Sequence, residues 1–257
     1  MQLNEGGNAF ANAVPVLKKD VPAVVNAAKK LIPKPLLQRI QTDIGSAGYK
    51  VESGDIDLMV EAEDVVALFQ TQNEKDPIKS AKKALENYFI GKGIDSLVKG
   101  NNVHIGVPYG KDTVAQVDVM VIHDANIVAP YHQHGPRGSY DDPEFVGNAI
   151  FILMNSIGKP LGLKFDAFGA KLLRRDDNTV VARDRDAVAK ILLNPKATGD
   201  DLNSVKSIMR ALENDPMRDE KLAQAMGDES KGLITLPKKI AEGSPSWFRQ
   251  MQSILVG

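Results

Sequence analysis

Residues 45–60 read GSAGYKVESGDIDLMV, and this stretch decides the fold. The glycines and the serine at its start favour a tight turn, and the apolar run at its end favours a buried strand. Side chains alternate faces along a strand, so Asp55 and Asp57 point the same way, roughly 7 Å apart. The apolar residues between and after them point the other way, into a core. The stretch therefore predicts a strand with one apolar face and one acidic face.

Two carboxylates on one face of a strand repel each other, and a divalent cation relieves that repulsion. The turn at Gly45 and Ser46 can offer backbone N–H groups and a hydroxyl to a phosphate held by the same cation. A third carboxylate comes from Asp118, which lies within the apolar run VDVMVI at 117–122. These residues together predict a site for a metal-bound phosphate.

The order of these motifs resembles that in the nucleotidyltransferase palm of the polymerase beta superfamily. The motifs are Gly-Ser, then Ser-Gly-Asp-Ile-Asp, and then a distant Val-Asp-Val-Met-Val. Within this superfamily, the family X DNA polymerases are the most similar, because they carry these motifs in the same order. The resemblance implies that Asp55 and Asp57 bind two Mg²⁺ (or Mn²⁺) ions. It also implies that Asp118 completes the shell of the ion that activates the attacking hydroxyl.

The same resemblance implies where a nucleotide binds. Gly45 and Ser46 hold the triphosphate, and Lys50 is the nearest base that can neutralise it. Ser53, in the motif that carries the two aspartates, is a further candidate for nucleotide contacts.

A second stretch, which begins at residue 144, resembles the thumb of family X polymerases. It consists of EFVGN, an apolar helix to residue 157, and then LGLKFDAFG. In that family a Tyr-Phe-x-Gly-Ser turn opens the thumb. Phe145 and Gly147 are therefore candidate nucleotide contacts, while Glu144 replaces the tyrosine. The two matches cover residues 40–193.

Hydrophobic periodicity and turn signals predict the other elements. We expect helices at 15–32, 36–42, 63–70 and 76–89, strands at 96–99, 103–107 and 114–122, and a mobile loop at 124–143. In the second half we expect a hairpin from 171–174 and 179–183, a helix capped by Asp184 or Asp186, and helices at 201–214, 219–226 and 236–254. We interpret His132 and His134, in the expected loop, as surface polar residues rather than as metal ligands.

This order of elements predicts an α+β fold. A nucleotidyltransferase palm, in which helices back a mixed β-sheet, is followed by a small α/β thumb and a helical C-terminal region. We expect boundaries at 1–43 for an N-terminal arm and helices, 44–143 for the palm, 144–194 for the thumb-like domain and 195–257 for the helical region.

Composition limits the class of protein. The 257 residues are 43% apolar and 25% charged, as in an ordinary globular protein with a core. The absence of cysteine excludes disulfides and thiolate zinc sites. No apolar run is long enough for a bilayer, and the first residues do not read as a signal peptide, so we expect a cytoplasmic protein with no membrane partner.

Charge is unevenly spread, although the formal net charge is only −1. Residues 52–64 hold six acidic residues and no base, and residues 159–185 hold seven bases against four acids. An acidic strand and a basic segment suit phosphate chemistry, whereas a solvated surface is the simpler explanation for the basic segment alone.

The sequence thus predicts a metal-dependent nucleotidyltransferase that uses a nucleoside triphosphate. The acceptor hydroxyl that we favour is a nucleic-acid 3′ end, and a protein or a small molecule remains open. We expect poor templating, because the helix at 150–154 reads IFILM where family X polymerases carry polar residues toward base and template. The alternatives are a transferase that modifies tRNA or a protein, and a catalytically silent palm-fold scaffold.

Overall fold

The computed structural model describes residues 9–42, 44–45, 47–48, 51–71, 76–132 and 147–230. Contacts divide the chain into two compact units, Met1–Gly138 and Ser139–Gly257. Ser46, Lys50, Phe145, His134 and the helix expected at 236–254 lie outside the described residues. The finer division of the chain into four parts remains a prediction.

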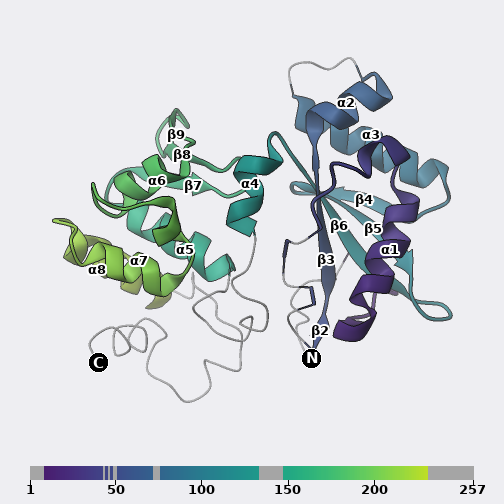
Figure 1. Ribbon diagram of the computed structural model, residues 1–257, viewed down its shortest axis with the longest axis horizontal. Coiled ribbons are helices and arrows are strands. Elements are labelled where there is room, and N and C mark those ends of the chain that lie inside the picture. The colour runs from purple at the N-terminus through teal and green to yellow at the C-terminus, as the bar shows by residue number, and fades with distance from the viewer. Residues whose placement is uncertain are drawn as a thin grey trace. The chain divides into compact units, whose positions relative to one another are not determined.

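A four-stranded mixed sheet forms the centre of the first unit, with the strand order β3-β6-β5-β4 (Figure 1). Its strands are β3 (Asp55–Glu61), β4 (Ser96–Lys99), β5 (Asn102–Pro108) and β6 (Val114–Ile122). β3 and β6 are parallel, and the other neighbouring pairs are antiparallel. A parallel pair needs a long crossover, and helices α2 (Ala62–Phe69) and α3 (Pro77–Gly91) lie in that connection.

One face of this sheet is apolar and lies in the hydrophobic core. The alternate residues that face it come from three strands: Ile56, Leu58 and Val60; Val103, Ile105 and Val107; Val117, Val119 and Val121. Helices α1 (Val21–Leu31), α2 and α3 pack against them, and Leu85 and Phe89 of α3 are fully buried. Burying such a side chain contributes about 1.5–3 kcal/mol. The core fixes which face of each strand is left for polar residues.

Helix α3 shows how local sequence sets an element. Asp76 caps its start, because its Oδ1 accepts a hydrogen bond from the Lys79 N–H at 3.0 Å, and Pro77 occupies the first turn. After the helix, Gly93 adopts a left-handed conformation with φ of 74°. The predicted helix at 76–89, its cap and its end are confirmed.

Two helices expected near the N-terminus differ from the structure, the first in where it begins and the second in its type. The helix expected from residue 15 begins only at Val21; a two-residue strand, β1 (Val16–Leu17), comes first and pairs antiparallel with β2 (Glu52–Ser53). The helix expected at 36–42 is replaced by a 3-10 helix at Lys34–Leu36. Gln41 then pairs with Met59, because β3 lies at the sheet edge and its free backbone groups attract another segment.

The loop expected at 124–143 contains a helix, α4 (Ala125–His132). Its start is capped by Asp124, whose Oδ1 accepts from the N–H groups of Asn126 and Ile127. The many Pro, His and Gly residues of this segment concealed that cap and the apolar residues that follow it. Residues 133–143 lie outside the described part of the chain.

The second unit contains α5 (Gly147–Gly158) and a three-stranded antiparallel sheet, β7 (Leu163–Asp166), β8 (Lys171–Arg174) and β9 (Val180–Ala182). Helices α6 (Arg185–Leu192), α7 (Val205–Leu212) and α8 (Arg218–Ser230) follow, with a 3-10 helix at Gly199–Leu202. Asp184 rather than Asp186 caps α6, and the helix expected from 201 begins at Val205 because Ser204 caps it. The expected apolar helix and hairpin are confirmed.

The α+β class predicted from the sequence, with a mixed sheet backed by helices, is therefore confirmed. Among the helices within the described ranges, none combines the length and the apolar character that crossing a bilayer requires.

Candidate active site

The register of the sheet brings two of the three aspartates together. Asp57 on β3 lies directly opposite Asp118 on β6, and Asp55 lies opposite Gln116. Paired residues on parallel strands point to the same side of a sheet, so all three carboxylates lie on the face opposite the core. The sequence predicted this shared face for Asp55 and Asp57, and the strand order adds Asp118 to it.

The environment of Asp57 strongly disfavours a negative charge. Burial, and then the neighbouring charges of Asp55 and Asp118, raise the pKa of the Asp57 carboxyl from 3.8 to about 8. Although the residue keeps part of its surface exposed, its carboxyl group is surrounded by protein atoms and by like charge. At neutral pH and without a cation, Asp57 is therefore mostly protonated.

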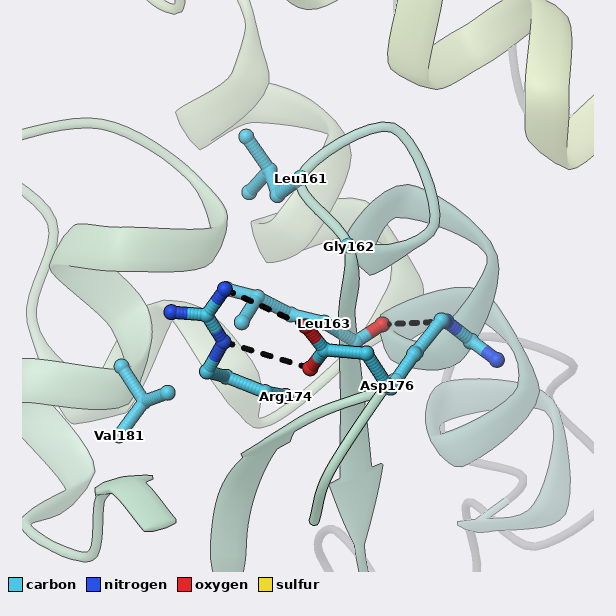
Figure 2. Close-up of a pocket in the computed structure, with 7 residues that line it drawn as sticks. Leu161, Gly162, Leu163, Arg174, Asp176 and Val181 are labelled. Atoms are coloured by element: carbon cyan, nitrogen blue, oxygen red, sulfur yellow. Dashed lines mark hydrogen bonds and ion pairs between the residues drawn. The ribbon is translucent and has the colours of Figure 1, made fainter. Parts of the chain in front are cut away.

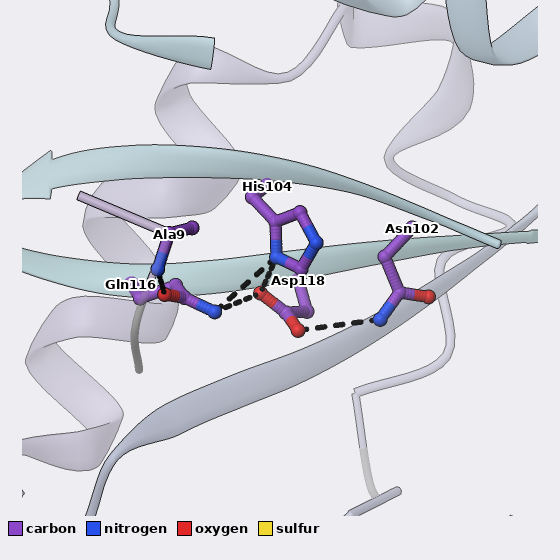
Figure 3. Close-up of polar contacts among 5 residues, drawn as sticks. All are labelled: Ala9, Asn102, His104, Gln116 and Asp118. Atoms are coloured by element: carbon purple, nitrogen blue, oxygen red, sulfur yellow. Dashed lines mark hydrogen bonds and ion pairs between the residues drawn. The ribbon is translucent and has the colours of Figure 1, made fainter. Parts of the chain in front are cut away.

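Asp118 has a different environment, because three donors surround its carboxylate (Figure 3). Its Oδ1 accepts from Nδ1 of His104 at 2.6 Å and from Nε2 of Gln116 at 2.8 Å, and its Oδ2 accepts from Nδ2 of Asn102 at 3.2 Å. The whole residue is 5% exposed. Asp118 is thus a buried carboxylate with hydrogen-bond partners, and not the crowded, unpaired charge that the apolar run around it suggests.

His104 acts as a donor in this network. A carboxylate can only accept, so Nδ1 of the imidazole carries the proton that faces Asp118. The hydrogen bond to Asp118 is the largest cause of a raised pKa for His104, and burial opposes it. The imidazole is consequently easier to protonate than a free histidine, which favours positive charge beside the carboxylate.

Gly45 lies directly against Asp57. A Cβ atom at position 45 would overlap the Asp57 carboxylate, and the backbone there has φ of +71°, a conformation that favours glycine. The Gly45 N–H donates to the carbonyl oxygen of His132 at 3.1 Å. Glycine is therefore needed at this position for close approach, and its N–H is already engaged with α4 in this structure.

We expect Gly45→Ala to disturb the site more than the same change at Gly48. Both glycines have positive φ, so both substitutions introduce backbone strain of about 1–2 kcal/mol. Only at position 45 does the new methyl group meet the Asp57 carboxylate, whereas at 48 it meets Val21 at 4.0 Å. Thermal melts should show the larger loss for Gly45→Ala. Equal melting temperatures for the two variants would contradict the close contact.

Ser53 lies on β2, two residues before Asp55, and is 2% exposed. Among the residues that the structure describes, its Oγ has no hydrogen-bond partner. A buried hydroxyl usually forms a hydrogen bond, so this atom is consistent with the predicted contact to a ligand. Gly147 begins α5 in the second unit. The proposed roles of Ser46, Lys50 and Phe145 remain predictions.

The residues at the site have the chemistry that a divalent cation needs, but the side chains that the structure describes are not arranged as a ligand set. A carboxyl group whose ionisation is opposed by two neighbouring aspartates suits a hard cation with oxygen ligands. Within the described ranges, however, no three His, Asp or Glu side chains are grouped as metal ligands. Asp118 faces three donors from the described part of the chain, which use three of the four lone pairs of a carboxylate and leave one on Oδ2.

The sequence reasoning missed Asn102, His104 and Gln116. A signal was present, because in the strand at 102–107 the polar residues Asn102 and His104 alternate with Val103 and Ile105. Such alternation marks a polar face opposite the core. Gln116 likewise precedes Asp118 by two residues and so shares its face.

The second unit contains a pocket of about 440 Å³ beside β8 (Figure 2). Arg174 forms an ion pair with Asp176 at 3.3 Å. Arg175 donates to the carbonyl oxygens of Leu163 at 2.7 Å and Asn155 at 3.0 Å. Both guanidinium groups are thus already engaged. The pocket therefore gives little support to a phosphate-binding role for this basic segment.

Other basic side chains of the segment at 159–185 are also paired. Lys159 contacts Asp228 at 2.6 Å, and Lys171 contacts Asp166 at 3.5 Å. Asp166 is one of the four acids already counted in this segment, so of these two partners only Asp228, far along the chain, reduces its net positive charge.

Comparison with known proteins gives distant structural likenesses. Neither a family model nor a curated protein sequence matches the chain. Among solved structures, a ternary complex of Leishmania infantum polymerase beta is 11% identical, with a TM-score of 0.43 over 74% of this chain and 77% of that one.

Two further solved structures have lower TM-scores. The Cid1 poly(U) polymerase with MgGTP bound is 12% identical, with a TM-score of 0.27 over 55% of this chain and 41% of that one. A cytoplasmic RNA terminal U-transferase is 13% identical, with a TM-score of 0.25 over 59% of this chain and 44% of that one. At such distances no substrate and no site residue transfers to this chain.

Proposed function

We propose that this protein is a divalent-cation-dependent nucleotidyltransferase, which moves a nucleoside monophosphate from a nucleoside triphosphate to an acceptor hydroxyl. The register of β3 and β6 carries the proposal, because it sets Asp57 opposite Asp118 with Asp55 on the same face. The raised pKa of Asp57 adds support, since it marks a place where negative charge is costly without a cation.

Asp55 and Asp57 would hold the cations, and Asp118 would contribute the remaining lone pair of its Oδ2. When bound, two divalent cations supply charge neutralisation on the triphosphate and favour loss of the proton from the attacking hydroxyl. The hydroxyl oxygen would bond to the α-phosphorus as the bond from that phosphorus to the bridging oxygen breaks, so that pyrophosphate leaves and the hydroxyl proton passes to solvent. Asp57 must first release its own proton, because its pKa of about 8 keeps it protonated at neutral pH.

A nucleic-acid 3′ end is the acceptor that we favour, with little template dependence. Support for the weak template dependence comes from α5, whose sequence resembles the family X thumb helix. Three of its residues, Leu153, Met154 and Ile157, have no exposed surface, and Ile150 is also buried. These side chains pack in the core of the second unit and cannot contact a base or a template strand.

The proposal is tested by incubating the protein with each α-labelled nucleoside triphosphate, Mg²⁺ or Mn²⁺, and a panel of acceptors. The panel holds single-stranded DNA and RNA, a gapped duplex, tRNA and the protein itself. Cation-dependent transfer of label to one acceptor supports the proposal. If no acceptor is labelled under any of these conditions, transfer to a nucleic acid or to the protein itself is contradicted, and the palm-fold scaffold becomes the favoured function.

We expect transfer to a primer to depend weakly on the template base. The apolar α5 leaves few polar side chains that could report base pairing, so correct and mismatched nucleotides should be added at rates within about 10-fold of each other. Single-nucleotide addition opposite each template base measures this ratio. Strong preference for the complementary nucleotide would contradict the role that we give to α5.

A further inference from the structure

The N-terminal arm, residues 9–14, pairs with the beginning of β6. The Val14 N–H donates to the Val114 carbonyl at 3.0 Å, and the Val114 N–H donates to the Asn12 carbonyl at 3.2 Å. Ala13 forms a parallel bridge with Val114. The pairing of β3 with β6 begins only at Asp55 and Gln116. Since β5 occupies the other edge of β6, the arm continues the edge that β3 uses farther along.

The first described residue of the arm reaches a side chain beside the site (Figure 3). The Ala9 N–H donates to Oε1 of Gln116 at 2.8 Å. A primary amide accepts through its oxygen and donates through its nitrogen. With the oxygen bound to the arm, the Gln116 NH₂ group is turned to Oδ1 of Asp118, 2.8 Å away. The arm therefore selects one of the two orientations of this amide.

The orientation matters because the other one would place the amide oxygen beside a carboxylate oxygen. Two acceptors in contact repel, and the Asp118 carboxylate would then rotate or lose a donor. In the observed orientation, Gln116 and His104 both donate to Oδ1, while Asn102 is the one donor to Oδ2 among the residues that the structure describes. The carboxylate plane is thereby fixed, with the free lone pair on Oδ2.

Packing alone does not account for this arrangement. The hydrophobic core cluster begins, along the chain, at Val16, after the arm. The polar network lies on the opposite face of the sheet, where burying Gln116, His104 and Asp118 together has a desolvation cost that apolar side chains would avoid. A buried polar network that orients one carboxylate is the kind of arrangement that supports a reacting or metal-binding group.

We propose that Gln116 and the Ala9 N–H are positioning groups for Asp118, and that the N-terminal arm is a working part of the active site. This inference rests on the proposed nucleotidyl transfer. Neither group touches the reacting atoms: Gln116 acts through Asp118, and the arm acts through Gln116. The pairing of residues 9–14 with β6 thus controls the orientation of the Asp118 carboxylate.

Two substitutions test separately the contact of Ala9 with Gln116 and the contact of Gln116 with Asp118. Ala9→Pro removes the N–H donor, whereas Ala9→Ser keeps it and serves as the matched control. Gln116→Met removes both ends of the amide with little change in volume and leaves the backbone intact. The double variant Ala9→Pro with Gln116→Met tests whether the arm acts only through Gln116.

The measurement is kcat and KM for the nucleoside triphosphate, with a thermal melt of each variant. We expect kcat to fall about 10- to 100-fold in Ala9→Pro and in Gln116→Met, with KM nearly unchanged. The double variant should match Gln116→Met alone, and Ala9→Ser should match the wild type. A variant that unfolds is replaced by the other, since each breaks the same contact from a different side.

Three outcomes overturn the inference. If the wild type transfers nucleotides and both single variants keep its kcat, the positioning role is wrong and the proposed function stands. If the two losses multiply in the double variant, the arm does not act through Gln116. If the wild type transfers to no acceptor, the proposed function fails and the positioning role fails with it.

Discussion

Asp57→Asn should stabilise the cation-free protein and abolish its transfer activity. The substitution keeps the shape of the side chain and removes an ionisable group whose negative charge is opposed by burial and by two neighbouring aspartates. The amide cannot replace a carboxylate as a cation ligand, so transfer should fall by about three orders of magnitude or more. Opposite effects on stability and activity are characteristic of a functional site that stores electrostatic strain.

The destabilisation of the wild type by Asp57 should depend on pH. Between pH 3.8 and about pH 8, folded Asp57 keeps a proton that the unfolded chain loses. The free energy of unfolding therefore falls as pH rises through this window, and the loss is complete above the folded pKa. The pKa of His104 is also raised, so its contribution is likewise lost as pH rises.

Melting curves measured with a chelator at pH 4 and pH 8 test the prediction. At pH 8 we expect Asp57→Asn to melt about 5–10 °C above the wild type, and at pH 4 the two should melt alike. Asp112→Asn, the same change at an exposed turn position, is the matched control and should follow the wild type. A constant difference across this pH range would show that Asp57 is not the group that titrates.

Asp118→Asn should lose both stability and activity. The carboxylate accepts from Asn102, His104 and Gln116, and an amide nitrogen in its place would face at least one of these donors. Leaving a buried donor without an acceptor costs about 1–3 kcal/mol. The sequence alone predicts the opposite, that Asp118→Asn is at least as stable as the wild type. It gives no sign of the three donors, because two of them lie on another strand and the third is two residues away.

Transfer by Asp118→Asn should also fall by about three orders of magnitude, since the third carboxylate is lost. Denaturant unfolding and transfer rates of Asp57→Asn and Asp118→Asn, measured side by side, check the contrast. Two inactive variants with opposite shifts in stability are expected. If Asp118→Asn is more stable than the wild type, the hydrogen-bond network around it is wrong; if it keeps full activity, Asp118 does not belong to the site.

Much of the fold could be predicted from local sequence. The alternation of Ile56, Leu58 and Val60 with the two aspartates sets the face of β3 that is buried, and the cap at Asp76 sets the start of α3. Such signals involve residues close together along the chain. They fail where a distant segment decides, as at Gln41, which pairs with the edge of β3 instead of forming a helix.

The candidate site could be predicted only in part, because strand order is not local. Asp55 and Asp57 share a face by the period of a strand, but the contact of Asp57 with Asp118 depends on β3 lying next to β6. The same holds for His104 on β5, whose role follows from its register with Asp118 on β6. The Ala9 contact spans 107 residues, and nothing near Ala9 in the sequence indicates it.

The most direct test of the account is proton release on cation binding. If the carboxylates bind a divalent cation, Asp57 must ionise, and a group with a pKa of about 8 is about 90% protonated at pH 7. Calorimetric titration of Mn²⁺ into the protein at pH 7, in two buffers of different ionisation enthalpy, measures the protons released. We predict close to one proton per protein for the wild type and none for Asp57→Asn. Absence of Mn²⁺ binding, or the same proton release from both proteins, would contradict a cation site at Asp57.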